Sequence, residues 1–279
     1  MSSLTVSIIQ ANLAWEDKAA NLRMFEDRIN SLGPTELIVL PEMFSTGFSM
    51  KPKELAETMA GDTVTWMKKL SANRKAIITG SLIIEEDGDY YNRLVWMLPN
   101  GQYGYYDKRH LFGFAGEHQH YASGNKRLIA SVKGWKINLQ VCYDLRFPVW
   151  ARQQNAPEVE IDEEDFGGPQ FVPHAPAAPE YDILIYVANW PERRSHAWKT
   201  LLQARAIENQ CYVVGVNRVG QDGNGINHSG DSMIVDPLGE VLHTAQDEHV
   251  HTLTLKKEDL ELIRSKFPFL KDGDSFMIV

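Results

Sequence analysis

The stretch ILIYVANWPERRSHAWKTLLQARAIENQCYVVGV, residues 183–216, contains the clearest alternation of strand and helix patterns in this chain. Residues 183–188 and 212–216 are short apolar runs typical of buried strands, and residues 197–209 between them are predicted to form a helix. A strand, a helix and a second strand in this order are a βαβ unit, from which parallel sheets are built. The sequence therefore predicts an α/β fold.

Comparable patterns occur on both sides of this unit. Further strands are predicted at residues 4–10, 37–40, 76–84, 90–98, 103–106, 137–141 and 250–255. Helices are predicted at residues 19–32, 63–73 and 258–266. Asp62 is the expected N-cap of the second helix, and residues 230–244 indicate a hairpin that turns at Asp236 and Pro237. Because neither a repeat nor a linker divides the chain, we expect one layered α/β domain over residues 1–279.

One segment interrupts these patterns. Residues 155–180, NAPEVEIDEEDFGGPQFVPHAPAAPE, contain five of the 13 prolines and seven acidic residues, without a lysine or arginine. The segment has neither the period of a strand nor that of a helix. It is therefore predicted to be an exposed loop inserted into the domain.

Composition limits the classes of partner. The formal net charge of −9 argues against nucleic acid or an anionic membrane surface, because phosphates would be repelled. The apolar runs are far shorter than the roughly 20 residues that a membrane-spanning helix needs. No export signal is recognisable at the N-terminus, and two cysteines do not make a disulfide framework. These observations predict a cytoplasmic protein whose partner is a small molecule.

Three ionisable residues follow predicted strands directly, where α/β sheets place their active sites. They are Glu42, Lys108 and Cys142. A carboxylate can act as a base toward a thiol, and an ammonium can stabilise an oxyanion. Lys108, or a helix beginning in YDLRFP, would lower the pKa of the thiol. Spacing alone does not bring the three together, and a core cysteine with two surface charges remains the alternative.

Three blocks in this order resemble the signature of the nitrilase or carbon-nitrogen hydrolase superfamily. They are PEMFSTGF at 41–48, YDKRHLF at 106–112 and VCYDLRFPVW at 141–150. The segments YVANWPERRSHAW, LLQARAIENQCYVVGVNRVGQDGNG and GDSMIVDPLGEVL are similar to the omega-amidase branch, the bacterial 2-oxoglutaramate or 2-oxosuccinamate amidases. The resemblance implies a four-layer α-β-β-α sandwich in which two mixed sheets pack face to face.

The resemblance also implies a role for each site residue. Cys142 would be the nucleophile, Glu42 the base and Lys108 the holder of the oxyanion. Glu117 would support the lysine and position water, and the backbone N–H of Tyr143 would complete the oxyanion hole. The implied reaction is amide hydrolysis through a thioester, which requires neither a cofactor nor a metal. A homodimer or higher homo-oligomer is expected.

A 2-oxo dicarboxylic acid monoamide, the substrate class of this branch, carries a carboxylate. On a chain of negative net charge, a local cation must bind that carboxylate. Our candidates for binding the substrate are Trp190, Arg193 and Arg194, at the stiff turn that follows a predicted strand. The two arginines would supply the cation, although solvated loop arginines are the alternative. Arg146 resembles a structural partner instead. The branch often has an aromatic residue where this chain has His228.

Other readings of the sequence remain open. A nitrilase or an N-carbamoyl amidohydrolase would use the same triad, and a non-catalytic binding protein would use the same fold. His118 and His120 are close in sequence but lack the spacing of a zinc protease. Cys211 is expected in the core because it adjoins an apolar run. The glycines at 220, 223 and 225 lack the spacing of a nucleotide-binding loop and predict a tight turn near the pocket.

Overall fold

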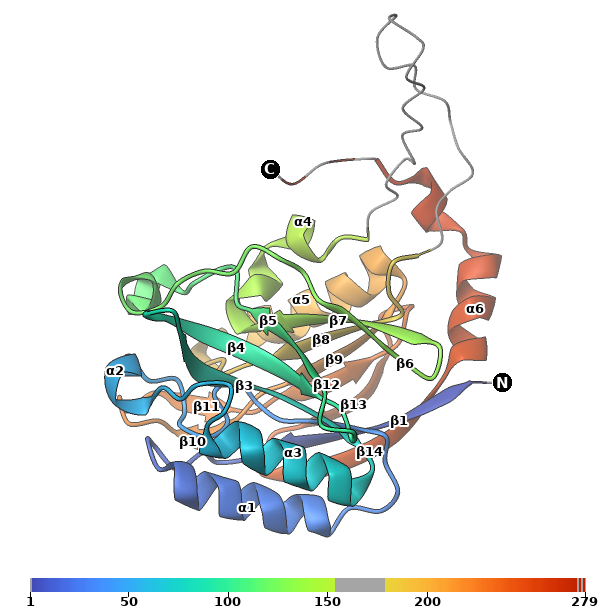
Figure 1. Cartoon of the computed structure of the whole chain (residues 1–279). Helices are drawn as coiled ribbons and strands as arrows, with labels where there is room; N and C mark the ends of the chain where they lie inside the picture. The colour runs from blue at the N-terminus through green and yellow to red at the C-terminus, as the bar shows by residue number, and fades with distance from the viewer. Residues whose placement is uncertain (1, 154–178, 275, 277, 279) are drawn as a thin grey trace, which may run out of the picture.

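The computed structural model describes residues 2–153, 179–274, 276 and 278. The insertion predicted at residues 155–180 lies outside the described residues except for its last two positions. Two six-stranded sheets form the centre of the domain (Figure 1). Among the described residues, no helix combines the length and the apolar character needed to cross a bilayer.

The first sheet has the strand order β14-β1-β2-β3-β4-β5. Its strands are β14 (His249–Lys256), β1 (Ser3–Gln10), β2 (Leu37–Val39), β3 (Ile77–Glu86), β4 (Asp89–Met97) and β5 (Tyr103–Asp107). Neighbours are parallel from β1 to β3 and antiparallel elsewhere, so the sheet is mixed.

The second sheet has the order β13-β12-β9-β8-β7-β6. Its strands are β13 (Val241–Ala245), β12 (Ser232–Val235), β9 (Tyr212–Val216), β8 (Ile183–Val187), β7 (Trp135–Val141) and β6 (Ile129–Val132). The predicted βαβ unit is confirmed, because β8 and β9 pair in parallel and α5 (Ser195–Asn209) connects them. The predicted hairpin is also confirmed as β12 and β13.

Helices cover the outer faces of both sheets, which confirms the expected four layers (Figure 1). Phe25 of α1 (Lys18–Asn30) and Met67 of α3 (Asp62–Arg74) pack on the first sheet, and Trp198 of α5 packs on the second. The other helices are α2 (Pro52–Leu55), α4 (Pro148–Ala151) and α6 (Lys257–Lys266), together with the 3-10 turns η1 (Gly113–Ala115), η2 (Glu117–Gln119), η3 (Cys142–Arg146), η4 (Glu192–Arg194) and η5 (Phe269–Asp272).

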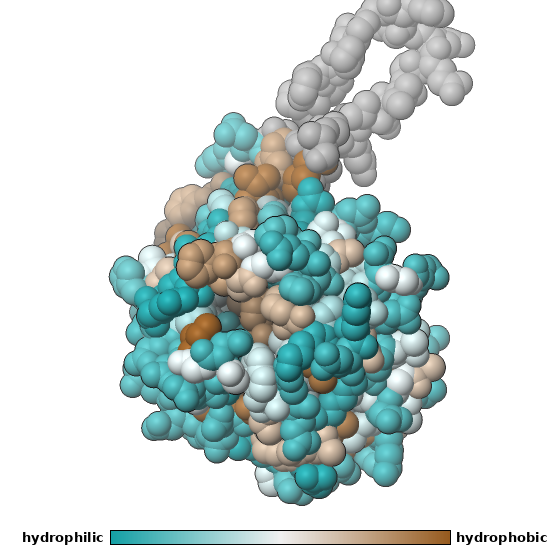
Figure 2. Space-filling view, turned by 90° about the vertical axis from the view of Figure 1, so that its left-hand side faces the viewer, coloured by the Kyte–Doolittle hydropathy of each residue, from teal (hydrophilic) through white to brown (hydrophobic). Residues whose placement is uncertain are grey.

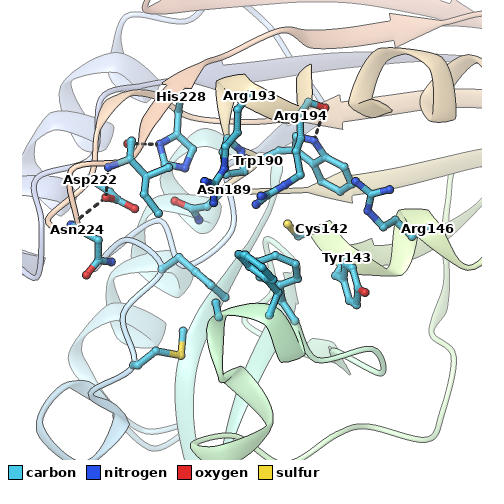
Figure 3. A pocket seen from close by; sticks show the side chains of 17 residues that line it. Cys142, Tyr143, Arg146, Asn189, Trp190, Arg193, Arg194, Asp222, Asn224 and His228 are labelled. Atoms are coloured by element: carbon cyan, nitrogen blue, oxygen red, sulfur yellow. Dashed lines mark hydrogen bonds between the residues drawn. The ribbon is translucent and has the colours of Figure 1, made fainter. Parts of the chain in front are cut away.

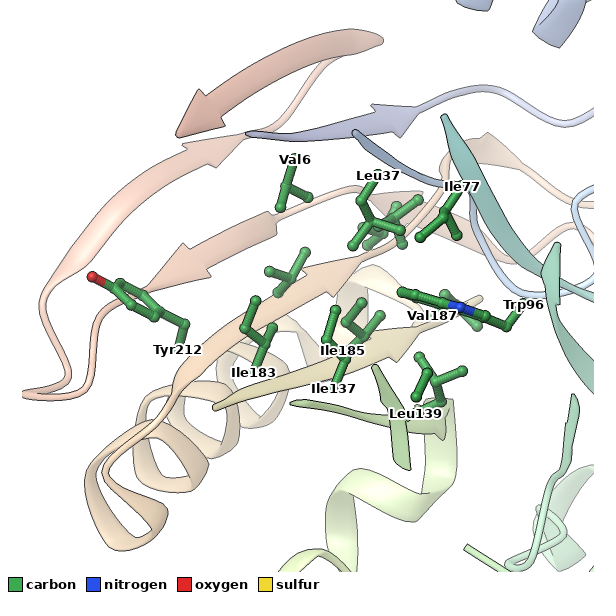
Figure 4. Close-up of a cluster of buried hydrophobic side chains, with 14 of the residues drawn as sticks. Val6, Leu37, Ile77, Trp96, Ile137, Leu139, Ile183, Ile185, Val187 and Tyr212 are labelled. Atoms are coloured by element: carbon green, nitrogen blue, oxygen red, sulfur yellow. The ribbon is translucent and has the colours of Figure 1, made fainter. Parts of the chain in front are cut away.

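Strand β8 shows why its sequence is apolar throughout. Successive side chains of a strand point to opposite faces. Ile183, Ile185 and Val187 therefore enter the core between the sheets, whereas Leu184 and Tyr186 pack beneath α5 (Figure 4). A strand covered on both faces needs apolar residues at every position.

The prediction that Asp62 is the N-cap of the second helix is wrong. Gly61 is the N-cap of α3, and Asp62 is the first residue of the helix. The carboxylate of Glu57 accepts a hydrogen bond from the Thr63 N–H at 2.8 Å. A residue outside the helix thus satisfies one of the N–H groups that have no partner within the first turn. The sequence patterns also missed β6 and the short hairpin of β10 (Val219–Gln221) and β11 (Asn227–Ser229).

Candidate active site

Three buried charged side chains meet between the two sheets. Lys108 Nζ lies 2.9 Å from Glu42 Oε1 and 2.9 Å from Glu117 Oε2, and all three side chains have no solvent exposure. Lys108 follows β5, Glu42 lies three residues beyond β2, and Glu117 is in η2. The structure thus brings together three residues whose proximity their spacing alone could not establish.

Cys142 begins the tight turn that follows β7. Its φ of 46° lies in the left-handed region, which residues other than glycine adopt rarely and at a cost in energy. The buried carboxylate of Asp144 holds this turn by accepting hydrogen bonds from the Val141 N–H at 3.0 Å and from the Tyr106 hydroxyl at 2.8 Å. The turn therefore fixes the thiol where the strand ends.

Glu42 joins both sheets at this point. Its Oε1 accepts a hydrogen bond from Asn92 Nδ2 at 2.8 Å, and its Oε2 accepts one from the Asn189 N–H at 2.7 Å. The Asn189 side chain donates in return to the Glu42 carbonyl at 2.6 Å. Asn92 and Asn189 were missed by our sequence reasoning; the position of Asn189 directly after an apolar strand was the available signal.

The electrostatics of the thiol differ from our expectation. Burial and the neighbouring carboxylate of Glu42 raise the pKa of Cys142 well above its usual value, and the opposing effect of Lys108 does not reverse this. The η3 turn spans only five residues and is too short for a helix dipole of useful size. The resting group is therefore a thiol, and the neighbouring carboxylate of Glu42 can accept its proton.

The Lys108 ammonium is attracted to both carboxylates of the cluster, whereas the two carboxylates repel each other. Burial by itself would lower the pKa of Lys108, but the carboxylates of Glu117 and Glu42 outweigh it and raise this pKa. Burial raises the pKa of Glu117, and the lysine opposes that shift. Lys108 is consequently an ammonium throughout the physiological range, as a stabiliser of an oxyanion must be.

Cys142 opens into a cavity of about 330 Å³ (Figure 3). Phe48, Met50, Phe112 and Phe114 contribute an apolar wall, and cationic side chains form another wall. Figure 2 faces this side of the molecule and shows hydrophobic residues around a hollow in a mostly hydrophilic surface. The volume suits a small molecule of a few carbon atoms.

The cationic wall consists of Arg146, Arg193 and Arg194, and all three line the cavity (Figure 3). Arg194 is half-buried, with its guanidinium 5.1 Å from the centre of the Phe112 ring. Burial, followed by the charge of Arg193, lowers the pKa of Arg194. Among the described residues, no carboxylate forms an ion pair with any of these three arginines.

Trp190 holds the wall in place. Its indole N–H donates to the Arg194 carbonyl at 2.8 Å, and its backbone N–H donates to Asn217 Oδ1 at 2.7 Å. The ring also lies 5.0 Å from the guanidinium carbon of Arg146. Arg146, which we interpreted as a structural partner, is therefore also a residue of the cavity.

The remaining predicted residues have separate surroundings. Tyr143 lies in the first turn of η3, where backbone N–H groups have no partner within the helix, and its ring packs 5.0 Å from that of Phe112. His228 lines the cavity, and burial followed by the charge of Arg218 lowers its pKa to about 4. Cys211 is fully buried under α5, as expected.

Comparisons with known proteins identify relatives along the whole chain. The model of the family described as carbon-nitrogen hydrolase matches residues 5–265. The omega-amidase YafV of Escherichia coli K12 is 42% identical over 282 residues, and that of Yersinia enterocolitica is 41% identical over 283; each alignment covers 100% of both chains. The 2-oxoglutaramate amidase of Bacillus subtilis is 28% identical over 96% of both chains.

Solved structures show the same fold. XC1258 from Xanthomonas campestris, described as a CN-hydrolase superfamily protein with an arsenic adduct in its active site, superposes with a TM-score of 0.91 at 42% identity and covers 100% of both chains. Nit3 of Saccharomyces cerevisiae, a nitrilase superfamily member, gives a TM-score of 0.76 at 22% identity, covering 95% of this chain and 94% of its own.

Proposed function

This chain belongs to the carbon-nitrogen hydrolase family, and from that premise we propose that it hydrolyses the terminal amide of a small 2-oxo dicarboxylic acid monoamide through a thioester on Cys142. The expected resemblance to omega-amidases and the expected activity, a hydrolase that acts on amides, are confirmed by the full-length similarity. The substrate and the covalent intermediate are the proposed part.

The first half of the reaction forms the thioester. Cys142 Sγ attacks the amide carbon while the thiol proton passes to the neighbouring carboxylate of Glu42. The carbonyl oxygen becomes an oxyanion, which the Lys108 ammonium and the Tyr143 N–H stabilise. Glu42 then gives the proton to the amide nitrogen, the C–N bond breaks and ammonia leaves.

The second half reverses these transfers with water. Glu42 accepts a proton from water as the oxygen attacks the thioester carbon, and Glu117 holds Lys108 in position during the attack. The C–S bond breaks, and the sulfur recovers its proton from Glu42. The acid product loses its proton to solvent and leaves as a carboxylate. No atom changes its oxidation state, so no redox partner or cofactor is required.

The observation that carries the substrate proposal is the unpaired cationic wall within the cavity of Cys142. A guanidinium binds a carboxylate through two parallel hydrogen bonds, and Arg194 is the best buried of the three candidates. A cavity of about 330 Å³ holds a four- or five-carbon dicarboxylic monoamide between this wall and the thiol. The enzyme names of its relatives agree with that substrate class.

The test measures ammonia and 2-oxo acid released from 2-oxoglutaramate and 2-oxosuccinamate, with a neutral amide of equal length, a nitrile and an N-carbamoyl amino acid as comparisons. We expect the acidic amides to be preferred at least tenfold in kcat/KM. Intact-mass analysis during turnover should show the acyl group on Cys142. Preference for the nitrile or the carbamoyl compound would overturn the substrate assignment, and turnover without any adduct would overturn the thioester.

The homo-oligomer and the cytoplasmic location belong to the same proposal. Sedimentation of the untagged protein tests the first, with a single species at the mass of one chain as the contradicting result. Fractionation of cells that express the protein tests the second.

A further inference from the structure

Three histidines meet at one edge of the sandwich, outside the cavity of Cys142. His243 belongs to β13, the edge strand of the second sheet, whereas His249 and His251 belong to β14, the edge strand of the first. One ring nitrogen from each of the three lies within 4.8 Å of those of the other two. The rings of His243 and His251 stack at 3.6 Å with an angle of 2° between their planes.

The topology explains why these residues meet. Residues 246–248 carry the chain from the edge strand of one sheet to the edge strand of the other, and side chains of β13 and β14 meet beside this connection. His249 and His251 are two residues apart on a strand and therefore share a face. His251 pairs with Ile8 and His243 pairs with Ile234, and both isoleucines belong to the core between the sheets. The histidines thus occupy inward-facing positions, where apolar side chains are the usual choice.

The backbone around the cluster is well anchored. The Gln10 side-chain amide donates hydrogen bonds to the Ala245 carbonyl at 3.0 Å and to the Asp247 carbonyl at 2.7 Å. Its oxygen accepts a hydrogen bond from the Ser232 hydroxyl at 2.6 Å. Since these bonds tie the connection to strands of both sheets, the three rings are held on rigid elements rather than on a loose loop.

Two ring nitrogens of the cluster lack hydrogen-bond partners among the described residues. The Nε2 atoms of His243 and His251 are buried, and neither forms a hydrogen bond with a described residue. A buried polar atom without a partner costs free energy, which a bound water or ion would recover.

We propose that His243, His249 and His251 bind a divalent transition-metal ion of the zinc class. Neutral imidazole nitrogens are preferred ligands of Zn²⁺, Ni²⁺, Cu²⁺ and Co²⁺. A pair at positions i and i+2 of one strand, joined by a third histidine from the edge strand of the other sheet, gives three ligands and leaves the fourth position of a tetrahedral ion open. Zn–N bonds of about 2.0–2.1 Å require the stacked rings of His243 and His251 to turn, because the nitrogen lone pairs lie in the ring planes and must converge on the ion.

The ion would join the edges of the two sheets. It takes no part in the amide hydrolysis proposed above, because none of its three ligands lines the cavity of Cys142. Its expected effect is on stability, since a ligand that binds the folded chain and not the unfolded chain raises the melting temperature. Metal binding thus differs in its readout from catalysis, and either proposal can fail without the other.

The test uses the untagged full-length Cys142→Ala protein, so that the catalytic thiol cannot bind the metal. After treatment with a chelator, calorimetric titration with Zn²⁺ should show one site per chain, and saturating Zn²⁺ should raise the melting temperature by about 3 °C or more. Mg²⁺, which prefers oxygen ligands, should produce no shift. Equal shifts with both ions, or no binding of Zn²⁺, would overturn the proposal.

Two variants locate the site. His249→Gln should weaken Zn²⁺ binding at least about tenfold, whereas the matched change His120→Gln, in the exposed His118–His120 pair, should leave it unaltered. Equal affinity in His249→Gln would refute the assignment. Should that variant fail to fold, the visible absorption of Co²⁺ bound to the Cys142→Ala protein decides: nitrogen-ligated cobalt supports the site, and the spectrum of the hydrated ion contradicts it.

Discussion

The buried cluster of Glu42, Lys108 and Glu117, here called the floor, and the cationic wall of the cavity are built in opposite ways. On the floor, the Lys108 ammonium pairs with the carboxylates of Glu42 and Glu117, and none of these side chains is exposed. On the wall, Arg193 and Arg194 are consecutive residues of η4 and form no ion pair with the described residues. Compensated charge on the floor thus contrasts with uncompensated charge on the wall.

This difference indicates that the floor serves catalysis and that the wall serves the choice of substrate. A charge that is paired before the substrate arrives keeps its geometry and needs no reorganisation during the reaction. A charge without a partner gains most from a ligand of opposite sign, and so discriminates among ligands. Changes on the floor should therefore reduce turnover for every amide, whereas changes on the wall should depend on the charge of the substrate.

The largest effect is expected for Cys142→Ala. The thiol is the only group that forms a covalent bond in the proposed reaction, so the turnover number should fall by about 10⁴-fold or more. Circular dichroism should show an unchanged fold, because the thiol opens into the cavity. The control is Cys211→Ala, which removes a buried sulfur remote from the chemistry and should leave the chemical step nearly unaltered. Substantial turnover by a Cys142→Ala sample of verified mass would refute the nucleophile.

Glu42→Gln should follow, with a loss of about 10³-fold in kcat, since the amide keeps the shape but cannot take the proton of the thiol. The carboxylate of Glu42 also raises the pKa of Cys142. Without this carboxylate, the ammonium of Lys108 lowers the pKa of Cys142 against less opposition. Thiolate should therefore form at lower pH than in the parent protein. Alkylation of Cys142 by iodoacetamide as a function of pH measures this; a midpoint that moves to higher pH would contradict our account of the floor.

Lys108→Arg should reduce kcat by about 10² to 10³, although the charge is kept. A planar guanidinium on a longer stem cannot make the contacts of a compact ammonium to both Glu42 and Glu117. Steady-state kinetics on acidic and neutral amides should show equal losses. A variant within twofold of the parent would mean that Lys108 does not hold the oxyanion.

The smallest effect, and the one that depends on substrate, is expected on the wall. Arg194→Ala should lower kcat/KM for an acidic amide by about 2 kcal/mol, roughly 30-fold, while a neutral amide of similar length is nearly unaffected. Arg193→Ala is the matched neighbour and should matter less, because Arg193 is exposed and Arg194 is half-buried. Equal losses of kcat/KM on both amides, or no loss in either variant, would show that the wall does not bind the substrate carboxylate.

The sequence by itself determined the local elements and the identity of the reactive groups. Apolar periodicity is a property of neighbouring residues. It was therefore sufficient to recognise the strands β8 and β9 and the helix α5 between them. The three blocks around Glu42, Lys108 and Cys142 indicated the family because each is a short continuous motif. Those predictions required no knowledge of which strands pair.

The tertiary structure alone decided how these groups act on one another. Asn92 and Asn189 come from different sheets to hold Glu42, and no local pattern relates them. From the sequence we expected a lowered pKa for Cys142, whereas in the structure this pKa is raised. The direction depends on burial and on the balance of charges contributed by distant segments. His243 and His251, likewise, meet only because the chain passes from one sheet to the other between them. Electrostatic and packing energies depend on distances in space, which the order of residues does not specify until the long-range strand pairings are formed.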